Sequence, residues 1–329
     1  MNQGRKVLIV GGAGFIGYHA VNQFLNRDYD VTAVSLPSKN KEMVFPKEVK
    51  VKIADINKLS DQELGEMLKG FWAVVFAAGA DDRVTPPKPA YPFFYASNVE
   101  SAKRFFEVAR KAGVKRGVLL SSYFAYFDRI WPDLKLSKYH PYIRSRKEQE
   151  REVISVAGDG LDVMILELPY IFGTAPGLKP LWEPLFKYIK KTPTVYFTQG
   201  GTNMVSVKHV AEAIVGAIEK GTAGRRYVIG DENVNWTQFI EKILKTLDLK
   251  KKIVIVPNFV TGLMMSGVWL KHFFQGREGG LNPVRFVSLQ GKKTYFDSSI
   301  ARDELGFGKG GLDEALSETI KLCEKIQEK

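Results

Sequence analysis

The chain has 329 residues, of which 45% are hydrophobic, enough for a sizeable core in one large domain or in two. Its single cysteine, Cys323, excludes an internal disulfide framework, and its four scattered histidines form no Cys/His zinc motif, so we expect no bound metal. The net charge of +12 is scattered and comes with no nucleic-acid-binding motif, so we expect a small-molecule ligand and not a nucleic acid.

Residues 7–10 form an unbroken apolar run, which predicts a strand buried on both faces of a parallel sheet. Glycines follow at once, and apolar residues then recur at helical spacing. Gly12, Gly14 and Gly17 satisfy the G-x-G-x-x-G fingerprint of dinucleotide binding, and Gly11, Gly14 and Gly17 satisfy the looser G-x-x-G-x-x-G. A turn without side chains lets a pyrophosphate approach the N–H groups and partial positive charge of a helix N-terminus. We therefore predict cofactor contacts from Gly11, Gly14, Phe15, Ile16 and Gly17.

A second strand is expected over residues 30–35. Its last position commonly carries an acid that binds the ribose hydroxyls of NAD, but Ser35 stands there and Lys39 follows. A hydroxyl with a nearby cation suits the 2′-phosphate of NADP better than a carboxylate does, because no like charges meet. We expect NADP as the cofactor, with NAD as the alternative.

Further strands are expected over residues 49–55, 73–80, 118–122 and 162–168, with helices between them. This alternation with short connections predicts an α/β fold of the Rossmann type, with a doubly wound parallel sheet. Asp55 ends the third strand, where its carboxylate could accept the adenine amino group. The fourth strand ends in small residues that suit close passage of a cofactor, namely Ala77, Ala78 and Gly79.

Beyond Gly173 the pattern loosens. We assign residues 1–173 and 203–230 to the NAD(P)-binding domain, 174–202 and 231–300 to a smaller C-terminal α/β substrate-binding domain, and 301–329 to a C-terminal helical segment. The apolar residues 259–270 are too few for a membrane span, which needs about 20, so we expect a core helix or a lid over an apolar pocket. Because the first strand begins so early, we expect no signal peptide and a cytoplasmic protein.

The order of the motifs resembles the extended branch of the short-chain dehydrogenase/reductase family, which comprises NAD(P)-dependent epimerases, dehydratases and reductases. Nearly the whole chain takes part, through GGAGFIG at Gly11, AD at Ala54, FAAGA at Phe76, NV at Asn98, SS at Ser121, PYIFG at Pro169, VSVKHVAEAI at Val205, YVIG at Tyr227 and FDSSIARDELGF at Phe296. The resemblance implies further cofactor contacts from Ile56, Asn98, Pro169 and Ile171. It also implies a homodimer built on helices over about residues 98–111 and 142–156.

Tyr142 opens a Tyr-x-x-x-Arg sequence after Ser122, where the family carries Tyr-x-x-x-Lys. The resemblance implies that Tyr142 is the acid/base and that Ser122 hydrogen-bonds the same substrate oxygen. It also implies that Arg146 binds the nicotinamide ribose and lowers the pKa of the Tyr142 phenol. The fixed charge of Arg146 can stabilise a phenolate but cannot relay a proton. Lys147 is no substitute, because it lies about 140° around the helix from Tyr142, whereas Arg146 lies only about 40° away.

The leading hypothesis is an NAD(P)-dependent oxidoreductase acting on a secondary alcohol or ketone by hydride transfer, with proton transfer assisted by Tyr142. The apolar residues 259–274 favour it, because they suit a hydrophobic substrate. A nucleotide-sugar epimerase or dehydratase is the alternative, favoured by Arg225 and Arg226, which suit a diphosphate. A non-catalytic NAD(P)-binding sensor or assembly factor is a third hypothesis, favoured by Arg146. Glu167 and His209 also depart from the family pattern, and we expect both to be structural.

Overall fold

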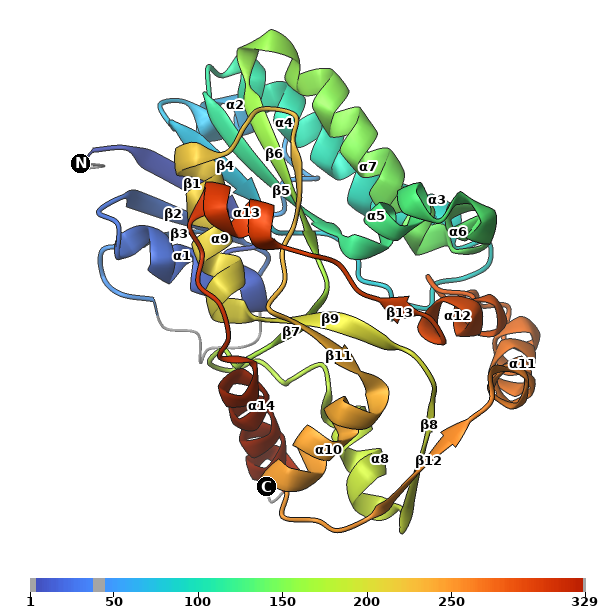
Figure 1. The fold of residues 1–329 in the computed structure, drawn as a ribbon. Coiled ribbons are helices and arrows are strands. Elements are labelled where there is room, and N and C mark those ends of the chain that lie inside the picture. The colour runs from blue at the N-terminus through green and yellow to red at the C-terminus, as the bar shows by residue number, and fades with distance from the viewer. Residues whose placement is uncertain (1–3, 38–44, 328–329) are drawn as a thin grey trace.

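The computed structural model describes residues 4–37 and 45–327 (Figure 1). Within them, seven strands form one parallel sheet in the order β10-β6-β5-β4-β1-β2-β3. These strands are β1 (Lys6–Val10), β2 (Asp30–Ser35), β3 (Lys50–Ile53), β4 (Ala73–Phe76), β5 (Arg116–Ser122), β6 (Asp162–Leu168) and β10 (Arg226–Val228). The chain moves outward from β1 to β3 and returns to β4 on the other side of β1. The predicted Rossmann-type, doubly wound α/β fold is therefore confirmed.

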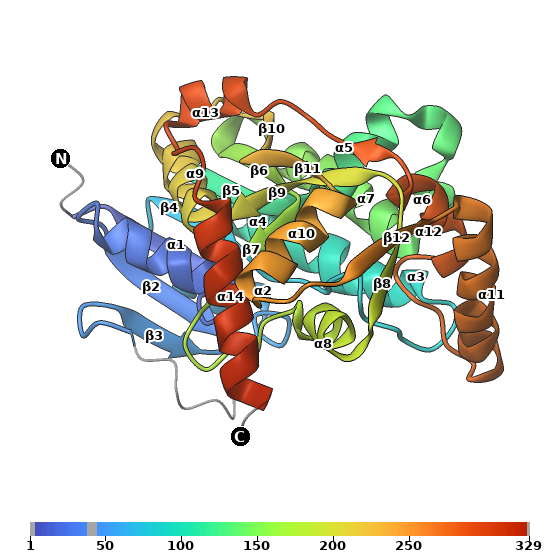
Figure 2. The same ribbon diagram turned by 60° about the horizontal axis from the view of Figure 1, so that its bottom comes forward.

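Helices cover both faces of this sheet, as Figures 1 and 2 show. The helices α1 (Phe15–Leu25), α9 (Val207–Lys220) and α13 (Ser299–Leu305) share one hydrophobic core with one face. The helices α2 (Asp61–Leu68), α4 (Ser101–Lys111) and α7 (Pro141–Ala157) share a second core with the other face. Along β1, Val7 and Ile9 enter the first core and Leu8 and Val10 the second. This alternation explains why the strand is apolar at every position but its first.

The helix expected from residue 98 begins earlier. A continuous helical stretch runs through α3 (Tyr91–Phe94) and the π-helical η1 (Tyr95–Glu100) into α4. Pro92 lies in the first turn, where its missing N–H costs no hydrogen bond, so the proline-rich loop could not be told from a helix start. The connection from β5 to β6 carries α5 (Tyr123–Ile130), η2 (Pro132–Leu134), α6 (Leu136–Tyr139), α7 and η3 (Gly158–Gly160).

A second, smaller sheet is centred on β9 (Gly201–Ser206), and a separate two-stranded ribbon lies beside it. The strand β9 pairs with β7 (Tyr170–Phe172), β11 (Glu232–Asn235) and β13 (Lys293–Thr294), while β8 (Thr194–Thr198) pairs with β12 (Lys252–Val256). The helices α8 (Glu183–Lys191), α10 (Trp236–Thr246) and α14 (Leu312–Gln327) complete this part. Its core includes Phe172, Trp236, Phe239 and Leu316.

The apolar residues 259–270 lie in α11 (Asn258–Phe274), which pairs with α12 (Pro283–Gln290) at the edge of the molecule (Figures 1 and 2). None of the 17 residues of α11 is buried, so a core helix was the wrong expectation. A run of apolar residues cannot by itself distinguish a helix that enters a core from one that lies on a surface. Among the described residues, no helix combines the length and hydropathy that crossing a bilayer requires.

A buried ionic cluster joins β6, β10, α5 and α7. The Glu150 and Glu167 side chains are each 1% exposed, and Arg129 donates to both, at 3.0 Å to Glu150 Oε2 and 2.6 Å to Glu167 Oε1. Arg226 also donates to Glu150, at 2.8 Å. Burial and the neighbouring Glu150 charge raise the pKa of Glu167 above its ordinary value, while Arg129 opposes this rise. Glu167 thus takes part in an ion-pair cluster that ties two strands to their covering helices.

We predict that Arg129→Ala lowers the free energy of unfolding by about 3–5 kcal/mol near neutral pH, because it leaves two buried carboxylates facing each other. A carboxyl whose pKa is raised by folding makes the folded protein less stable as the pH rises from the unfolded pKa through the folded pKa. The loss should therefore be larger at about pH 8 than at about pH 5. Urea unfolding followed by circular dichroism at both pH values measures it.

Lys111→Ala is the control, because Lys111 pairs with Glu107 on the exposed surface of α4. It should change stability by less than about 0.5 kcal/mol at either pH. An Arg129→Ala protein as stable as the parent at both pH values would contradict the structural role of the cluster.

Candidate functional site

The glycine turn after β1 leaves no space for side chains. Gly11 has a φ of +80°, and a Cβ atom there would lie 2.5 Å from Ala77 O at the end of β4. A Cβ at Gly17 would lie 2.1 Å from Gly11 O. The Gly11 N–H donates to Val34 O of β2 at 2.9 Å, which ties the turn to the neighbouring strand. The ends of β1, β2 and β4 and the start of α1 therefore meet at a spacing that only glycine permits.

The N-terminus of α1 opens toward this turn. The first helical bond runs from Tyr18 N to Gly14 O at 2.9 Å, so the N–H groups of Phe15, Ile16 and Gly17 precede it. Such N–H groups have no partner within the helix and carry its partial positive charge. Gly14 is the N-cap and contributes no side-chain cap. This end of the helix can therefore accept an anion such as a pyrophosphate.

A cavity of about 620 Å³ runs along the carboxyl ends of the strands from this turn. Its volume is in the usual range for small-molecule sites. It brings together seven of the predicted cofactor residues: Gly11, Gly14, Ser35, Asp55, Ile56, Ala78 and Gly79. It is also lined by residues that the sequence analysis did not single out, among them Asn57, Ala80, Val84, Phe93, Ser97 and Ser101. These residues lie in loops and near a helix start. No local sequence pattern predicts that these segments approach the sheet.

Ser35 is buried at the end of β2, beside the glycine turn. Its Oγ accepts the Ala13 N–H at 2.9 Å, so the hydroxyl hydrogen can still be donated to a ligand. Lys39, the cation expected beside it, lies outside the described residues. Asp55 lines the same cavity, and its carboxylate accepts the Asn57 N–H at 3.1 Å.

Asn98 lies in the π-helical turn η1 and is fully buried against the end of β4. Its Oδ1 accepts the Ala80 N–H at 2.8 Å, and its Nδ2 donates to Ser145 Oγ at 3.0 Å. Gly79 has a φ of +133°, and a Cβ there would lie 2.6 Å from Asn98 Oδ1. Asn98 therefore holds the small-residue end of β4 against α7 instead of lining the cavity itself. Single π turns of this kind are frequent at functional sites.

The three predicted catalytic side chains meet between β5 and α7. Ser122 ends β5, Tyr142 is the second residue of α7, and both are buried. Burial raises the pKa of Tyr142, whereas the Arg146 charge and hydrogen bonding to Arg146 and Ser122 lower it. The Arg146 Cζ lies 5.1 Å from the centroid of the Tyr142 ring. The Arg146 guanidinium, which lowers the pKa of the phenol, therefore lies one helical turn from Tyr142. The angle of about 40° between the two positions had implied this placement.

The Arg146 guanidinium faces the ends of β4 and β5. Its Nη1 donates to Gln149 Oε1 at 2.9 Å and to Leu120 O at 3.4 Å, and its Nη2 donates to Ala80 O at 3.4 Å. Its Nε is buried with no hydrogen-bond partner among the described residues. Lys147 instead reaches Asp128 at 2.8 Å, away from the phenol. Arg146 thus reaches the cavity only through Ala80, which lines it; Ser122, Tyr142 and Arg146 are not themselves among its lining residues.

Asp82 is an ionisable group of this region that the sequence analysis missed. Burial and the neighbouring Asp81 charge raise the pKa of Asp82 to about 6, and its own charge raises the pKa of Tyr142. Two acids directly after the small-residue end of β4 were the available sequence signal. With this pKa the Asp82 carboxyl can take up or release a proton near neutral pH.

A distant segment, residues 276–282, forms the wall over Tyr142. The Tyr142 N–H donates to Gly280 O at 3.0 Å, and a Cβ at Gly280 would lie 2.6 Å from Phe94 Cζ. The Nδ1 of His140 accepts the Asn282 N–H at 3.0 Å, and burial lowers the pKa of His140 to about 4. A neutral His140 therefore anchors this wall at neutral pH. No sequence pattern predicts this contact, because residues 140 and 280 are far apart in the chain.

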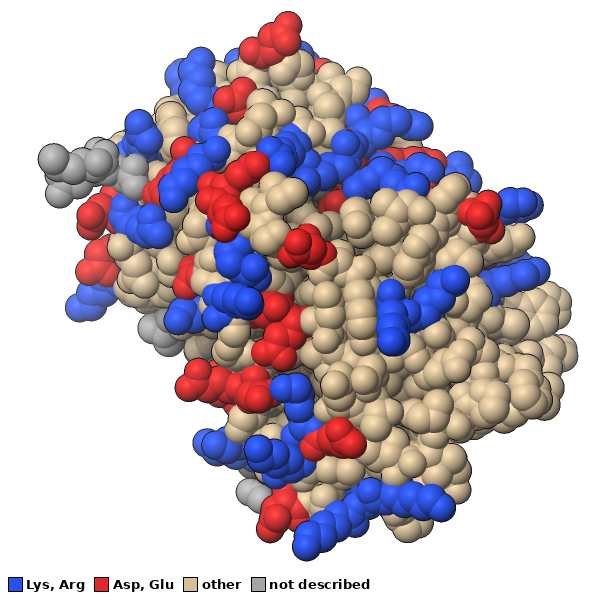
Figure 3. All heavy atoms as spheres, in the orientation of Figure 1, with Lys and Arg blue, Asp and Glu red and all other residues tan. Residues whose placement is uncertain are grey.

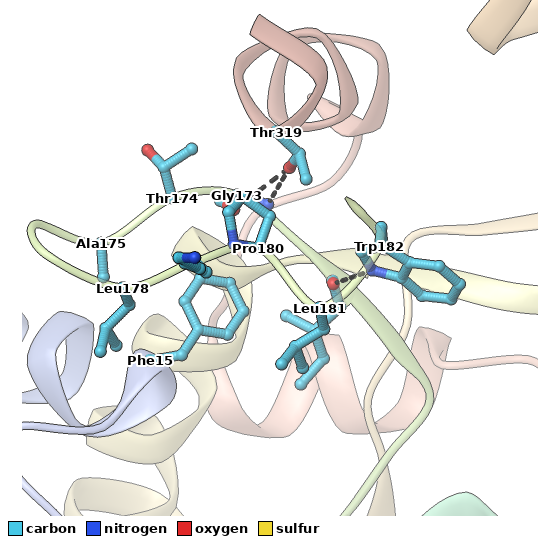
Figure 4. Close-up of a pocket in the computed structure, with 11 residues that line it drawn as sticks. Phe15, Gly173, Thr174, Ala175, Leu178, Pro180, Leu181, Trp182 and Thr319 are labelled. Carbon is cyan, nitrogen blue, oxygen red and sulfur yellow. Dashed lines mark hydrogen bonds between the residues drawn. The ribbon is translucent and has the colours of Figure 1, made fainter. Parts of the chain in front are cut away.

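A smaller, mainly apolar cavity of about 210 Å³ lies between the start of α1, the segment after β7 and α14 (Figure 4). Phe15 projects from α1 toward residues 173–182, and Thr319 Oγ1 accepts the Gly173 N–H at 2.8 Å. The Trp182 Nε1–H donates to Ile171 O at 3.1 Å. Phe15 and Ile171 thus line this smaller cavity and not the one that contains Ser35 and Asp55. Pro169 lies between β6 and β7 and lines neither cavity.

The comparisons with known proteins agree with this geometry. Residues 11–221 match the model of a family described as NAD(P)H-binding. The chain is 23% identical to a putative dihydroflavonol 4-reductase of Synechocystis sp., over 95% of this chain and 92% of that protein. It is 24% identical to the mouse (Mus musculus) sterol-4-alpha-carboxylate 3-dehydrogenase, decarboxylating, over 98% of this chain and 91% of that protein.

Among solved structures, the chain is similar in fold to the UDP-glucuronic acid 4-epimerase of Bacillus cereus, determined in complex with NAD. The TM-score is 0.69 at 14% identity, with 98% of this chain and 99% of the other covered. The likeness to this structure carries the fold alone, whereas the family model covers the glycine turn, the small-residue end of β4 and the Tyr142 segment. The chain therefore belongs to the NAD(P)H-binding proteins of the extended short-chain dehydrogenase/reductase family.

Proposed function

We propose that the protein is an NADP(H)-dependent oxidoreductase that interconverts a secondary alcohol and a ketone. One observation carries this proposal: Ser122, Tyr142 and Arg146 converge at the carboxyl ends of β4 and β5, next to a cavity built on the glycine turn. The names of the reductase and the dehydrogenases among its relatives support the same class of reaction. We also propose that the smaller C-terminal part binds the substrate.

The residues around the cavity fit a dinucleotide. The α1 N-terminus would hold the pyrophosphate, Asp55 would accept the adenine amino group, and Arg146 would hold the nicotinamide ribose. A bound nicotinamide supplies or accepts the hydride. In the direction of reduction, the Tyr142 phenol donates its proton to the ketone oxygen while the Ser122 hydroxyl hydrogen-bonds the same oxygen. The Arg146 charge stabilises the phenolate that remains until solvent returns the proton.

Arg225 and Arg226, the two arginines that favoured the nucleotide-sugar alternative, have partners within the chain. Arg225 pairs with Glu304 at 2.7 Å, and Arg226 pairs with the buried Glu150 at 2.8 Å. The Arg285 guanidinium stacks on Tyr139, 4.6 Å from the ring centroid. Guanidinium groups already engaged by this chain are less available for a diphosphate, which supports the oxidoreductase.

We further propose a homodimer through α4 and α7, on the family resemblance alone. Three apolar residues of α4 are buried within the chain itself, namely Phe105, Phe106 and Val108. They pack in the core under the sheet, so they supply no exposed apolar face for a partner.

Tyr142→Phe tests the proposed chemistry. The rate of NADPH oxidation, screened over aromatic, steroidal and sugar ketones, should fall by about 10²- to 10⁴-fold, because the phenol acts in the transition state. Nucleotide affinity, measured by calorimetry, should change little. Tyr139→Phe, which removes a phenol three residues away, should leave the rate unchanged. A loss of less than about tenfold for Tyr142→Phe would assign the proton to another group.

Arg146→Ala should move the pH profile of alcohol oxidation. Removing the positive charge raises the pKa of Tyr142, so the phenolate that oxidation requires forms only at higher pH. The rising limb of the rate against pH should shift to higher pH. Nucleotide affinity should fall. Lys147→Ala, whose ammonium pairs with Asp128, should keep the parent profile. If the pH profiles of Arg146→Ala and the parent were superimposable, the Arg146 charge would not stabilise the Tyr142 phenolate.

Ser35→Asp tests the choice of cofactor. The parent should bind NADPH more tightly than NADH, and the variant should reverse this order, because a carboxylate would meet the 2′-phosphate. Ser35→Ala is the matched control: it removes the hydroxyl without adding charge, so it should weaken NADPH binding without making NADH the tighter ligand. Tighter NADH binding by the parent protein contradicts the assignment of NADP.

A further inference from the structure

The helix α11 carries an apolar stripe that faces away from the protein. Phe259, Leu263 and Phe274 are 79%, 76% and 82% exposed, and Leu270 is 45% exposed. Their spacings of 4, 7 and 4 residues place all four within about 60° of arc on one face of the helix. A helix on the surface of a soluble protein normally turns such a stripe inward. Here the opposite face, which includes Thr261, Met265 and His272, is the more covered one.

The charges of the segment that contains α11, residues 249–277, are of one sign. Between Asp248 and Glu278 the sequence contains no acid but five cations: Lys250, Lys251, Lys252, Lys271 and Arg277. Figure 3 shows uncharged atoms over this edge of the molecule, with basic side chains beside them. The neighbouring β8–β12 ribbon adds two exposed apolar side chains, Tyr196 and Ile255. The surface thus combines exposed apolar side chains with basic side chains beside them.

The residues after α11 connect it to the candidate active site. The Lys88 N–H donates to Gly276 O at 2.9 Å, and the Glu278 N–H donates to Pro86 O at 3.0 Å. Two residues further, Gly280 packs on Tyr142. Phe93 and Val84, which line the larger cavity, are also partly exposed. The apolar stripe and the Tyr142 site are therefore parts of one continuous stretch of structure.

We propose that α11 lies in the surface of an anionic lipid bilayer and holds the entrance of the Tyr142 site against it. At about 1.5 Å per residue, its 17 residues form a rod of about 25 Å that would lie in the plane of the membrane. The stripe enters the apolar boundary while Lys271 and Arg277 meet anionic head groups. An alcohol or ketone dissolved in the bilayer would then lie near the segment that ends at Gly280, which packs on Tyr142. This last step rests on the proposed function, whereas the docking does not.

A second copy of the chain fits this surface less well. A two-fold contact brings identical patches together, so it would place the same five cations opposite one another with no acid from residues 249–277 to pair them. A bilayer that contains anionic lipid supplies both the apolar medium and the opposite charge. The α11 surface is also distinct from α4 and α7, the helices proposed for the homodimer.

The test is flotation of the full-length protein with vesicles of phosphatidylcholine and phosphatidylglycerol in about a 7:3 ratio. The parent should float with them and bind less at high salt or on pure phosphatidylcholine, because salt screens the cations. The double variant Leu263→Glu/Phe274→Glu should lose about tenfold or more in partitioning. Both side chains are exposed, so the fold should tolerate the change. Ile300→Glu, which alters an exposed apolar residue of α13, should float like the parent.

Light scattering of the same proteins without vesicles completes the experiment. The parent and the double variant should have the same mass. Failure of the parent to float, or equal flotation of the double variant, overturns the proposal. A mass that halves in the double variant overturns it too, because α11 would then be a subunit contact. Soluble-substrate turnover without vesicles reports on the proposed function separately.

Discussion

The close approach of β1 to β4 is the constraint on which the site depends. With Gly11 the backbone of the turn passes beside Ala77 O, whereas any side chain would begin 2.5 Å from that oxygen. Gly17 allows α1 to start directly against the turn in the same way. These contacts bring a helix N-terminus, with its unpaired N–H groups, to the point where the sheet order reverses. Moving the two strands apart would enlarge the cavity and separate the cofactor site from Tyr142.

The end of β4 transmits this geometry to α7 through buried polar groups. Asn98 binds Ala80 with one end of its amide and Ser145 with the other, and Ser145 Oγ donates to Tyr142 O at 2.8 Å. Asn98 and Ser145 are fully buried, so leaving one of these groups unpaired costs about 1–3 kcal/mol. The network therefore selects one position for α7 relative to the cofactor cavity. The π-helical turn is the local departure from an α-helix that aims Asn98 at Ala80.

Most of the sheet could be predicted from the sequence, because apolar runs and glycines report local requirements. The glycine turn, the strand ends and the Tyr142–Arg146 spacing all depend on residues close together in the chain. The rest depends on distant contacts. The π turn at Asn98, the wall at Gly280 and the outward stripe of α11 each arise from packing between segments far apart, for which periodicity carries no information. Asp82 was missed because an acid in a loop does not reveal its burial.

The protonation of Tyr142 depends both on residues close to it in the chain and on a distant segment. Burial is the largest cause of its raised pKa, and part of that burial comes from the Gly280 segment, which begins where α11 ends. The same exclusion of water strengthens the opposing interaction with Arg146, because a charge acts more strongly in a low dielectric. Asp82 adds a further charge that opposes ionisation and can itself be neutralised near pH 6. The ionisation of the phenol thus depends on the balance between burial, which raises the pKa of Tyr142, and the Arg146 charge, which lowers it.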